Sequence, residues 1–195
     1  MFTKADAEKI LSEKSQLHVL KDFDNLAEEK KTEFLKQIEN INWADISMIG
    51  KETSIPRGKF TVPAAVSIEE IEASKDKFLK AGIESIKKGE VAAVLLAGGM
   101  GTRLGFDLPK GCFNVGTSHE LYIFECLINN LMDVVKQCDT YIPLYIMTSE
   151  KNDGATQDFF EKHNYFGYNK DYVKFFIQDM ACAVDYKGKL LLEEK

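Results

Sequence analysis

The sequence predicts an α/β protein with a mostly parallel sheet, preceded by a helical arm. Helical and strand patterns alternate in the second half of the chain, and this alternation is typical of parallel sheets. A glycine-rich loop follows the first strand pattern directly, at the end of the sheet where such folds bind ligands. We expect helices on both faces of the sheet. The predicted strands are Val91–Val94, Leu144–Thr148 and Tyr172–Ile177, with helices at 119–137 and 153–163 between them.

The first 66 residues are predicted to form the helical arm and an irregular connection. Apolar residues recur at helical spacing between charged ones across residues 4–40, so we expect helix there. Residues 42–66 contain Pro56, Gly58 and Pro63 and are expected to be irregular, with Trp43 as a packing anchor. The chain is therefore divided into residues 1–66 and residues 67–195.

A further helix is predicted to begin at Ser67 and to end before Gly89. Ser67 and Glu70 have capping-box spacing, in which each side chain satisfies a backbone N–H group at the helix start. Gly89 suits the left-handed position that follows a helix. The apolar residues of this segment share one side, which we expect to be buried. They are Ile68, Ile71, Phe78, Leu79, Ile83 and Ile86.

Composition excludes several classes of protein. The chain has 195 residues, 45% of them hydrophobic and 29% charged, and no apolar run is long enough to span a membrane. The charged N-terminus lacks the apolar stretch of a secretory signal, so we expect a cytoplasmic protein without a membrane partner. A net charge of −6 without a basic block argues against a nucleic-acid partner.

Metal, redox and hydrolase chemistry are not indicated by the sequence. The four cysteines show no C-x-x-C spacing, so no protein-bound metal is expected and the thiols are interpreted as cytosolic and at least partly buried. The three histidines are scattered, without a serine or cysteine partner at the spacing of a catalytic triad. Adjacent Glu193 and Glu194 would face opposite sides of a strand and make a poor acid/base pair.

The most informative segment is the glycine loop, residues 95–105, closed by Pro109, Lys110 and Gly111. Four glycines lie within eight residues: Gly98, Gly99, Gly101 and Gly105. Glycines let the backbone approach a ligand closely, and successive N–H groups can form a concavity for an anion. Arg103 and Lys110 add cationic donors. The loop therefore predicts a site for a nucleoside triphosphate or another polyphosphate.

Two better-known phosphate motifs do not fit. The dinucleotide fingerprint requires glycine where this chain has Leu104, and the glycine comes one position later. The P-loop requires Gly-Lys followed by Ser or Thr, and no Gly-Lys pair here has that continuation. Thr148 and Ser149 end the second predicted strand, and Gln178 follows the third. Since parallel strands end at one edge, these points should converge with the glycine loop.

The stretch LAGGMGTRLG…PKG resembles the signature of sugar-nucleotide pyrophosphorylases. Together with segments 163–167 and 184–195, it resembles the UDP-N-acetylglucosamine (UDP-N-acetylhexosamine) pyrophosphorylase branch of the UDP-sugar pyrophosphorylase family. The resemblance runs from about Ser15 to the last residue. It implies a Rossmann-like nucleotidyltransferase (GT-A-like) fold with a mixed, mostly parallel sheet. Residues 67–195 would be the first part of the nucleotide-binding pyrophosphorylase domain.

The resemblance also implies roles for particular residues. Arg103 and Lys110 would be catalytic, stabilising the pyrophosphate, and Gln178 matches the family glutamine that holds the uracil base. Met100 and residues 179–182 (Asp-Met-Ala-Cys) depart from the family pattern, in which Gly-Met-Leu-Pro usually follows that glutamine. The nucleotide-binding residues would be Leu96, Ala97, Gly98, Gly99, Gly101, Thr102, Gly105 and Gln178.

The chemistry implied is uridylyl transfer from UTP to N-acetylglucosamine 1-phosphate, with Mg²⁺ bridging phosphate oxygens. We interpret the chain as an incomplete, N-terminal version of such an enzyme, because the family's metal-binding aspartate and sugar-recognition segments should come later. Such a chain should bind UTP weakly and be inactive alone, and it should expose apolar surface. Two alternatives stay open: a pyrophosphorylase for another hexose 1-phosphate, and a non-catalytic nucleotide-binding or interaction protein. The oligomeric state is not predicted.

Overall fold

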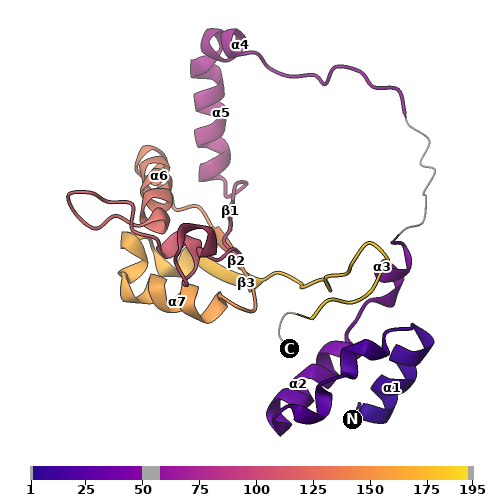
Figure 1. Cartoon of the computed structure of the whole chain (residues 1–195). Helices are drawn as coiled ribbons and strands as arrows, with labels where there is room; N and C mark the ends of the chain where they lie inside the picture. The colour runs from indigo at the N-terminus through magenta and orange to yellow at the C-terminus, as the bar shows by residue number, and fades with distance from the viewer. Residues whose placement is uncertain (1, 50–57, 193–195) are drawn as a thin grey trace. The chain divides into compact units, whose positions relative to one another are not determined.

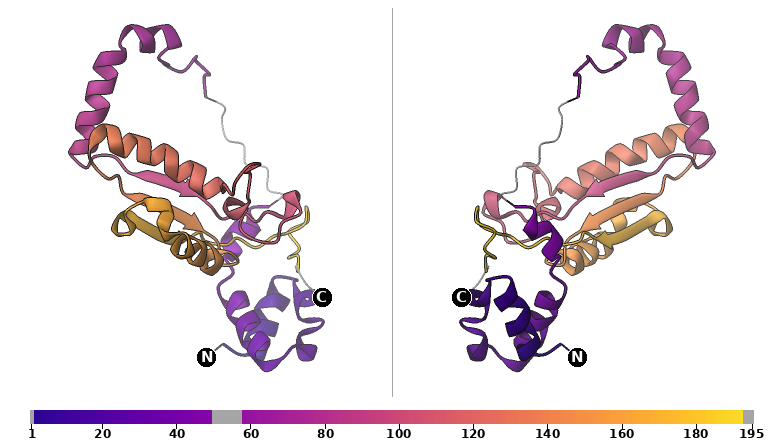
Figure 2. Two further views of the ribbon diagram at one scale, coloured as in Figure 1. Left: turned by 90° about the vertical axis from the view of Figure 1, so that its left-hand side faces the viewer. Right: turned by 90° about the vertical axis from the view of Figure 1, so that its right-hand side faces the viewer.

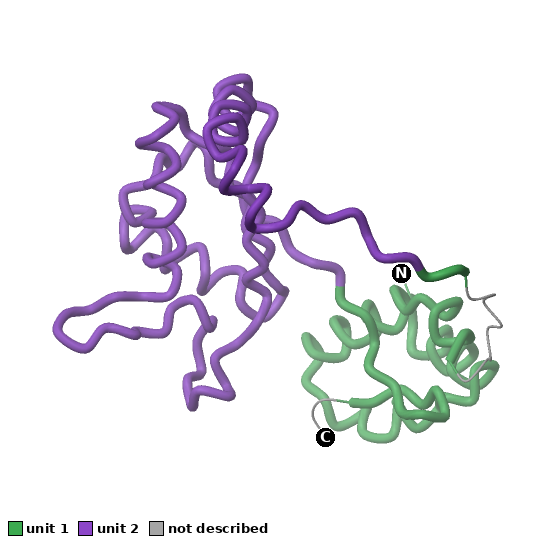
Figure 3. The backbone as a smooth tube through the Cα atoms, turned by 90° about the horizontal axis from the view of Figure 1, so that it is seen from above, with its two compact units in different colours: residues 1–60, 180–195 green, residues 61–179 purple. Residues whose placement is uncertain are grey.

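The computed structural model describes residues 2–49 and 58–192 (Figure 1). The chain forms two compact units (Figure 3): unit 1 contains residues 1–60 and 180–195, and unit 2 contains residues 61–179. Pro56, Glu193 and Glu194, named in the sequence analysis, lie outside the described residues. None of the described helices is long and apolar enough to cross a membrane.

The described residues of unit 1 form two α-helices over residues 4–40, rather than the single helical stretch expected there, and a third α-helix follows. These are α1 (Lys4–Glu13), α2 (Glu28–Glu39) and α3 (Trp43–Ser47), with the short 3-10 turns η1 (Leu17–Leu20) and η2 (Phe23–Asn25) between the first two. The prediction of helix through 4–40 is wrong because Ser15 takes a left-handed conformation (φ 56°) and ends the first helical segment. No glycine or proline marks this break in the sequence.

The core of unit 1 joins the N-terminal helices to the C-terminal segment. Ala7, Leu11, Val19 and Ile38 are buried together with Leu190. Leu190 belongs to a small hairpin in which Val184 and Leu190 pair, and residues between them form the predicted turn.

A buried glutamine holds this hairpin. The Gln16 side chain donates to the Gly188 carbonyl (2.8 Å) and accepts from the Leu190 N–H (3.1 Å). His18 Nε2 also lies 2.9 Å from the Leu190 carbonyl oxygen. The C-terminal segment of unit 1 is therefore fixed by both apolar burial and hydrogen bonds.

The region 42–66 is not irregular throughout, as the sequence predicted. α3 begins after Asn42, whose side chain accepts the Ala44 N–H (3.1 Å), so an ordinary N-cap starts a helix in this region. Trp43 packs against the core of unit 1, as expected.

The helix predicted from Ser67 is present but divided. The capping box of Ser67 and Glu70 is formed, and α4 (Ile68–Ala73) is followed by α5 (Lys75–Lys87), with Ser74 between them. Gly89 is left-handed (φ 73°) after α5, as predicted. The expected burial of the apolar side is wrong for much of its length: Ile68, Ile71, Phe78 and Leu79 are exposed. The helical periodicity of apolar residues identifies an apolar face, but it does not determine whether another element covers that face.

Unit 2 is built on a three-stranded parallel sheet in the order β1-β2-β3 (Figure 2). The strands are β1 (Ala93–Leu96), β2 (Leu144–Thr148) and β3 (Val173–Ile177). Leu95 lies opposite Ile146, which lies opposite Phe175. The parallel sheet predicted from the sequence is confirmed, and β2 has the predicted bounds.

Two helices cover one face of this sheet. They are α6 (Ile123–Cys138) and α7 (Asp153–Lys162). The Phe160 ring of α7 lies 4.9 Å from Phe124 of α6 and 5.6 Å from Phe175 of β3. Right-handed crossovers between strands in the order 1-2-3 place both helices on the same side. The core beneath them includes Leu144, Ile146 and Val173.

The opposite face of the sheet is open within the described residues, so the expectation of helices on both faces is wrong. Its side chains alternate with those of the core and include Val94 (61% exposed), Leu96 (72%), Tyr145 and Phe176. The expected exposure of apolar surface is confirmed here.

The connecting turns of unit 2 are η3 (Thr102–Leu104), η4 (Lys110–Cys112), η5 (Asn164–Gly167) and η6 (Lys170–Tyr172).

Helix α6 begins four residues later than predicted. The Asn114 side chain accepts the N–H groups of Gly116 (2.9 Å) and Leu121 (3.1 Å), which holds residues 114–121 as a loop. Glu125 then caps the helix by accepting the Tyr122 N–H (3.3 Å). Side-chain-to-backbone hydrogen bonds therefore compete with the helical pattern at residues 119–122.

Candidate functional site

The carboxyl ends of the three strands meet, as the sequence predicted. Ala97, directly after β1, donates its N–H to the Met147 carbonyl of β2 (2.7 Å). Gln178, directly after β3, donates its N–H to the Thr148 carbonyl at the end of β2 (3.0 Å). The glycine loop, the loop that enters α7 and Gln178 are therefore held at one edge of the sheet.

The glycine loop presents three consecutive unused backbone donors. The N–H groups of Gly98, Gly99 and Met100 donate to no other group in the described part of the chain. The Ala97 N–H before them and the Gly101 N–H after them are both bonded, to Met147 and to Leu108 (2.9 Å). Successive unpaired N–H groups are the feature by which a loop binds an anion.

A short antiparallel bridge closes the loop and brings Lys110 beside it. Met100 pairs with Pro109, and the Lys110 N–H donates to the Gly99 carbonyl (3.2 Å). The backbone of Lys110 is thus fixed next to the unused donors. Its side chain is exposed, and within the described residues no carboxylate forms an ion pair with it.

Thr102 and Arg103 lie on η3, the turn between the paired residues Met100 and Pro109. The turn ends at Gly105, whose left-handed conformation (φ 66°) explains the need for glycine there. Arg103 is exposed and is without a carboxylate partner in the part of the chain that is described. The structure therefore leaves both predicted cations available, with Lys110 tied to the loop and Arg103 on the adjoining turn.

Gln178 lies against the glycine loop at Gly98. A Cβ atom at Gly98 would lie 3.1 Å from Gln178 Nε2 and 3.4 Å from Oε1. Only glycine lets the side-chain amide approach this closely without displacement. Two residues 80 positions apart in the sequence, both predicted as binding residues, are therefore brought into contact. Leu96 is the last residue of β1, and its side chain is exposed on the open face of the sheet.

Sequence reasoning missed Asn152, which is 1% exposed and lies at the start of α7. Its Nδ2 donates to the carbonyls of Ala97 (2.9 Å) and Gly99 (3.4 Å), and its Oδ1 accepts the Ser149 N–H (2.8 Å). Asparagine directly before a helix is typical of an N-cap, and nothing in the local sequence indicates a contact with a loop 55 residues away.

Asp153, at the start of α7, is engaged in structural hydrogen bonds. Asp153 accepts hydrogen bonds from the Thr148 hydroxyl and from Gln157 Nε2 (2.7 Å). Its two carboxylate oxygens thus bond to the end of β2 and to helix α7. It holds the end of β2 against α7, and no role in proton transfer is indicated.

Cys112 is excluded as a nucleophile by its surroundings. It is buried on η4, and burial raises the pKa of its thiol to about 11. At neutral pH the thiol is therefore protonated, whereas nucleophilic attack requires the thiolate. Asp179 and Cys182, which depart from the family pattern, are exposed.

The described residues do not form a metal site of their own. No group of three or more His, Cys, Asp or Glu side chains among them could hold a metal ion. A Mg²⁺ ion that bridges nucleotide phosphates needs only one or two protein carboxylates besides water, so the expected Mg²⁺ stays a prediction.

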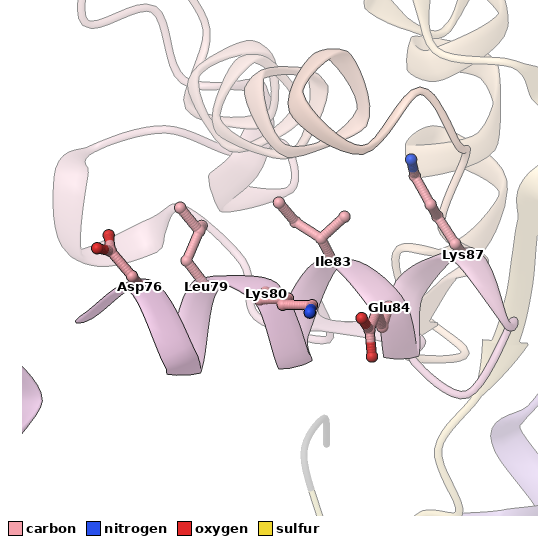
Figure 4. Close-up of a pocket in the computed structure, with 6 residues that line it drawn as sticks. All are labelled: Asp76, Leu79, Lys80, Ile83, Glu84 and Lys87. Carbon is pink, nitrogen blue, oxygen red and sulfur yellow. The ribbon is translucent and has the colours of Figure 1, made fainter. Parts of the chain in front are cut away.

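A pocket on α5 is distinct from the strand-end site. It is lined by residues of this helix alone, and none of them belongs to the glycine loop (Figure 4). The lining mixes opposite charges with two apolar side chains, so it presents no consistent chemistry for a ligand. The lining residues are Asp76, Leu79, Lys80, Ile83, Glu84 and Lys87.

Comparison with known proteins agrees with the resemblance seen in the sequence. Residues 20–195 match the model of the UDPGP family, described as UTP--glucose-1-phosphate uridylyltransferase. The chain is 33% identical over 186 residues to UDP-N-acetylglucosamine pyrophosphorylase of Saccharomyces cerevisiae, covering 93% of this chain and 39% of that protein. It is 34% identical over 200 residues to a probable UDP-N-acetylglucosamine pyrophosphorylase of Dictyostelium discoideum, covering 93% and 41%.

A solved structure supports the same relationship. The uridine diphosphate N-acetylglucosamine pyrophosphorylase of Trypanosoma brucei, in complex with an inhibitor, matches with a TM-score of 0.66 and 26% sequence identity. The match covers 94% of this chain and 40% of that chain. The chain thus spans about two fifths of the length of the relatives it matches.

Proposed function

We propose, on the premise that this chain belongs to the UTP--glucose-1-phosphate uridylyltransferase (UDPGP) family, that its glycine loop binds the triphosphate of UTP. The activity served would be the formation of UDP-N-acetylglucosamine and pyrophosphate from UTP and N-acetylglucosamine 1-phosphate. The observation that carries this proposal is the row of unused N–H groups at Gly98, Gly99 and Met100, beside Lys110 and Gln178.

The geometry suits uridylyl transfer without a covalent protein intermediate. An oxygen of the sugar 1-phosphate attacks the α-phosphorus of UTP, and the bond from that phosphorus to the β-phosphate oxygen breaks as pyrophosphate leaves. Such a reaction needs positioning and charge neutralisation more than a protein nucleophile. The loop N–H groups, Arg103 and Lys110 would bind the phosphates and neutralise charge on the leaving pyrophosphate.

Gln178 would recognise the base of the nucleotide. A side-chain amide offers one donor group and one acceptor, which is what the edge of uracil requires. Its contact with Gly98 would place the base next to the phosphate loop. The sugar substrate is proposed from the names of the matched relatives, which favour N-acetylglucosamine 1-phosphate over the glucose 1-phosphate of the family description.

The proposal is tested by calorimetric titration of the whole chain with UTP in the presence of Mg²⁺, up to millimolar nucleotide. We expect weak, saturable binding, and a Kd raised about tenfold in Arg103→Ala and in Lys110→Ala, as expected for a lost hydrogen bond to a charged group. Lys170→Ala is the matched control, because this lysine is exposed on η6, before β3.

Inorganic triphosphate in the same titration separates phosphate from base recognition. It should compete with UTP, and Gln178→Ala should weaken UTP while leaving inorganic triphosphate unchanged. A folded chain that shows no saturable binding of UTP would overturn the proposal. Equal affinity of the Lys110→Ala variant and the wild type would remove Lys110 from the site.

A further inference from the structure

The glycine loop is held by one buried side chain from outside it. Asn152 is the residue that joins the loop after β1 to the loop after β2, through the three hydrogen bonds to Ala97, Gly99 and Ser149. The Ala97 and Gly99 carbonyls that it binds flank Gly98, the residue in contact with Gln178. A single amide group therefore lies behind the part of the loop to which we assign phosphate binding.

The chemistry of these contacts fixes the orientation of the amide. A backbone N–H, that of Ser149, needs the side-chain oxygen, and two backbone carbonyls need the side-chain nitrogen. Aspartate could still accept from Ser149, but its carboxylate could not donate to the carbonyls. Only an amide satisfies both requirements at this position, and its burial makes an unsatisfied partner costly.

Peptide planarity links these contacts to the unused donors. In a trans peptide the C=O of one residue and the N–H of the next point in opposite directions. Since the Ala97 carbonyl is directed toward Asn152, the Gly98 N–H is directed away from it. The same holds for the Gly99 carbonyl and the Met100 N–H. The direction of the Gly98 N–H is thus set by Asn152. The direction of the Met100 N–H is set by Asn152 together with the Lys110 N–H, which donates to the same Gly99 carbonyl (3.2 Å).

We infer that Asn152 is a positioning residue for nucleotide binding, which aligns the loop N–H groups toward the phosphates without touching them. The direction of the loop peptides is a property of the free chain. The effect on UTP rests on the proposed function, so the two parts of the inference require separate readouts.

The test uses the 195-residue chain with Asn152→Asp and Asn152→Ala, and Thr156→Val as the matched control. Thr156 is also buried at the start of α7, and among the described side chains its Oγ1 is a buried atom without a hydrogen-bond partner. The valine variant therefore alters the same region without altering a contact to the loop. Asn152→Ala introduces no buried charge, so it serves if the aspartate variant does not fold.

The first readout is amide hydrogen exchange of Gly101 and Lys110, whose N–H groups close the loop by bonding Leu108 and Gly99. In the Asn152 variants we expect these amides to exchange about tenfold faster, as for the loss of one to two neutral hydrogen bonds. The amides of β2 and β3, and the loop amides of Thr156→Val, should keep their wild-type rates. A general loss of stability would instead accelerate all of them together.

The second readout is the Kd for UTP, which should rise about tenfold in the Asn152 variants and stay unchanged in Thr156→Val. Wild-type exchange rates at Gly101 and Lys110 in a folded Asn152→Ala would overturn the inference. Faster loop exchange with an unaltered Kd would overturn the part that concerns nucleotide binding. If the Asn152 variants show faster loop exchange but the wild-type chain itself binds no UTP, Asn152 still positions the loop and only the proposed function is rejected.

Discussion

Two buried side-chain amides each hold a loop in this molecule, Gln16 in unit 1 and Asn152 in unit 2. Gln16 is 4% exposed and Asn152 is 1% exposed. Each accepts one backbone N–H and donates to backbone carbonyl oxygen, so each joins segments that are distant in the sequence. The two loops differ in what becomes of their remaining N–H groups.

In the hairpin held by Gln16, every N–H from residue 187 to residue 191 is bonded. The Asp185 carboxylate accepts those of Lys187 and Lys189, both at 2.8 Å, and Gly188, Leu190 and Leu191 donate to other groups of unit 1. In the loop held by Asn152, three successive N–H groups are unused. A buried amide anchor alone therefore indicates a structural role, whereas unused donors beside it indicate a ligand site.

The largest effect is expected from Gln16→Ala. This change leaves the Gly188 carbonyl and the Leu190 N–H without their partner, which should cost about 3 kcal/mol of the stability of unit 1. Amides of α1 that exchange through opening of unit 1 should exchange about a hundredfold faster. Gln37→Ala, an exposed glutamine of α2, should leave these rates unchanged.

The affinity of Gln16→Ala for UTP distinguishes the role of Gln16 from that of Asn152. Gln16→Ala should bind UTP as the wild type does, because no described contact of Gln16 involves the glycine loop. A loss of UTP affinity equal to that of the Asn152 variants would contradict the distinction between a structural and a ligand-facing loop.

An intermediate effect is expected from Gly98→Ala. The new methyl group would lie within 3.1 Å of Gln178 Nε2 and displace this side chain, so the Kd for UTP should rise about tenfold. The fold should tolerate the change, since the displaced atoms are the end of a flexible side chain. Titration of UTP into this variant measures the effect.

Gly154→Ala is the matched control for this prediction. A Cβ atom there would meet nothing within 4 Å, and the residue lies in helix α7. The control should be more stable than the wild type by about 0.5–1 kcal/mol and should bind UTP equally well. Equal affinities of the Gly98→Ala and Gly154→Ala variants would show that Gln178 does not recognise the nucleotide.

The smallest effect is expected from pH at the hairpin. Hydrogen bonds from the Lys189 and Lys187 N–H groups lower the pKa of Asp185 below its ordinary value of 3.8. A carboxyl group with a lowered pKa stabilises the folded state above the unfolded value, and this contribution is lost as the pH falls through the folded value. Hairpin stability should therefore be constant from pH 7 to pH 5 and decline below 3.8.

The variant Asp185→Asn isolates this contribution from other carboxyl groups. Urea denaturation of the wild type and the variant at several pH values gives the difference between their unfolding midpoints. That difference should be constant above pH 5 and should shrink below 3.8. A difference that is independent of pH would show that the carboxylate charge does not contribute to the hairpin.

Local patterns in the sequence identified most elements of unit 2. The alternation of apolar runs and helical periods gave β2, β3 and α7 nearly to the residue, and the Ser67–Glu70 spacing gave the start of α4. These features depend on residues a few positions apart. The glycine loop was likewise visible, because its composition is unusual within a short segment.

Features that depend on distant residues were missed. The break at Ser15 coincides with Gln16 turning toward Gly188 and Leu190, and nothing near Ser15 in the sequence indicates those partners. The anchoring of the loop by Asn152 links positions 55 residues apart. The apolar side of α4 and α5 is present as predicted. The helical period of its residues does not determine whether another element covers that side.

The most direct test of the central claim is a two-dimensional ¹H–¹⁵N NMR titration of the ¹⁵N-labelled chain with UTP. If the unused donors bind the phosphates, the amide signals of Gly98, Gly99 and Met100 should shift most, in a saturable manner. The hairpin amides from 187 to 191, already bonded, should stay in place. Shifts confined to other regions, or none at millimolar UTP in a folded chain, would contradict phosphate binding by the glycine loop.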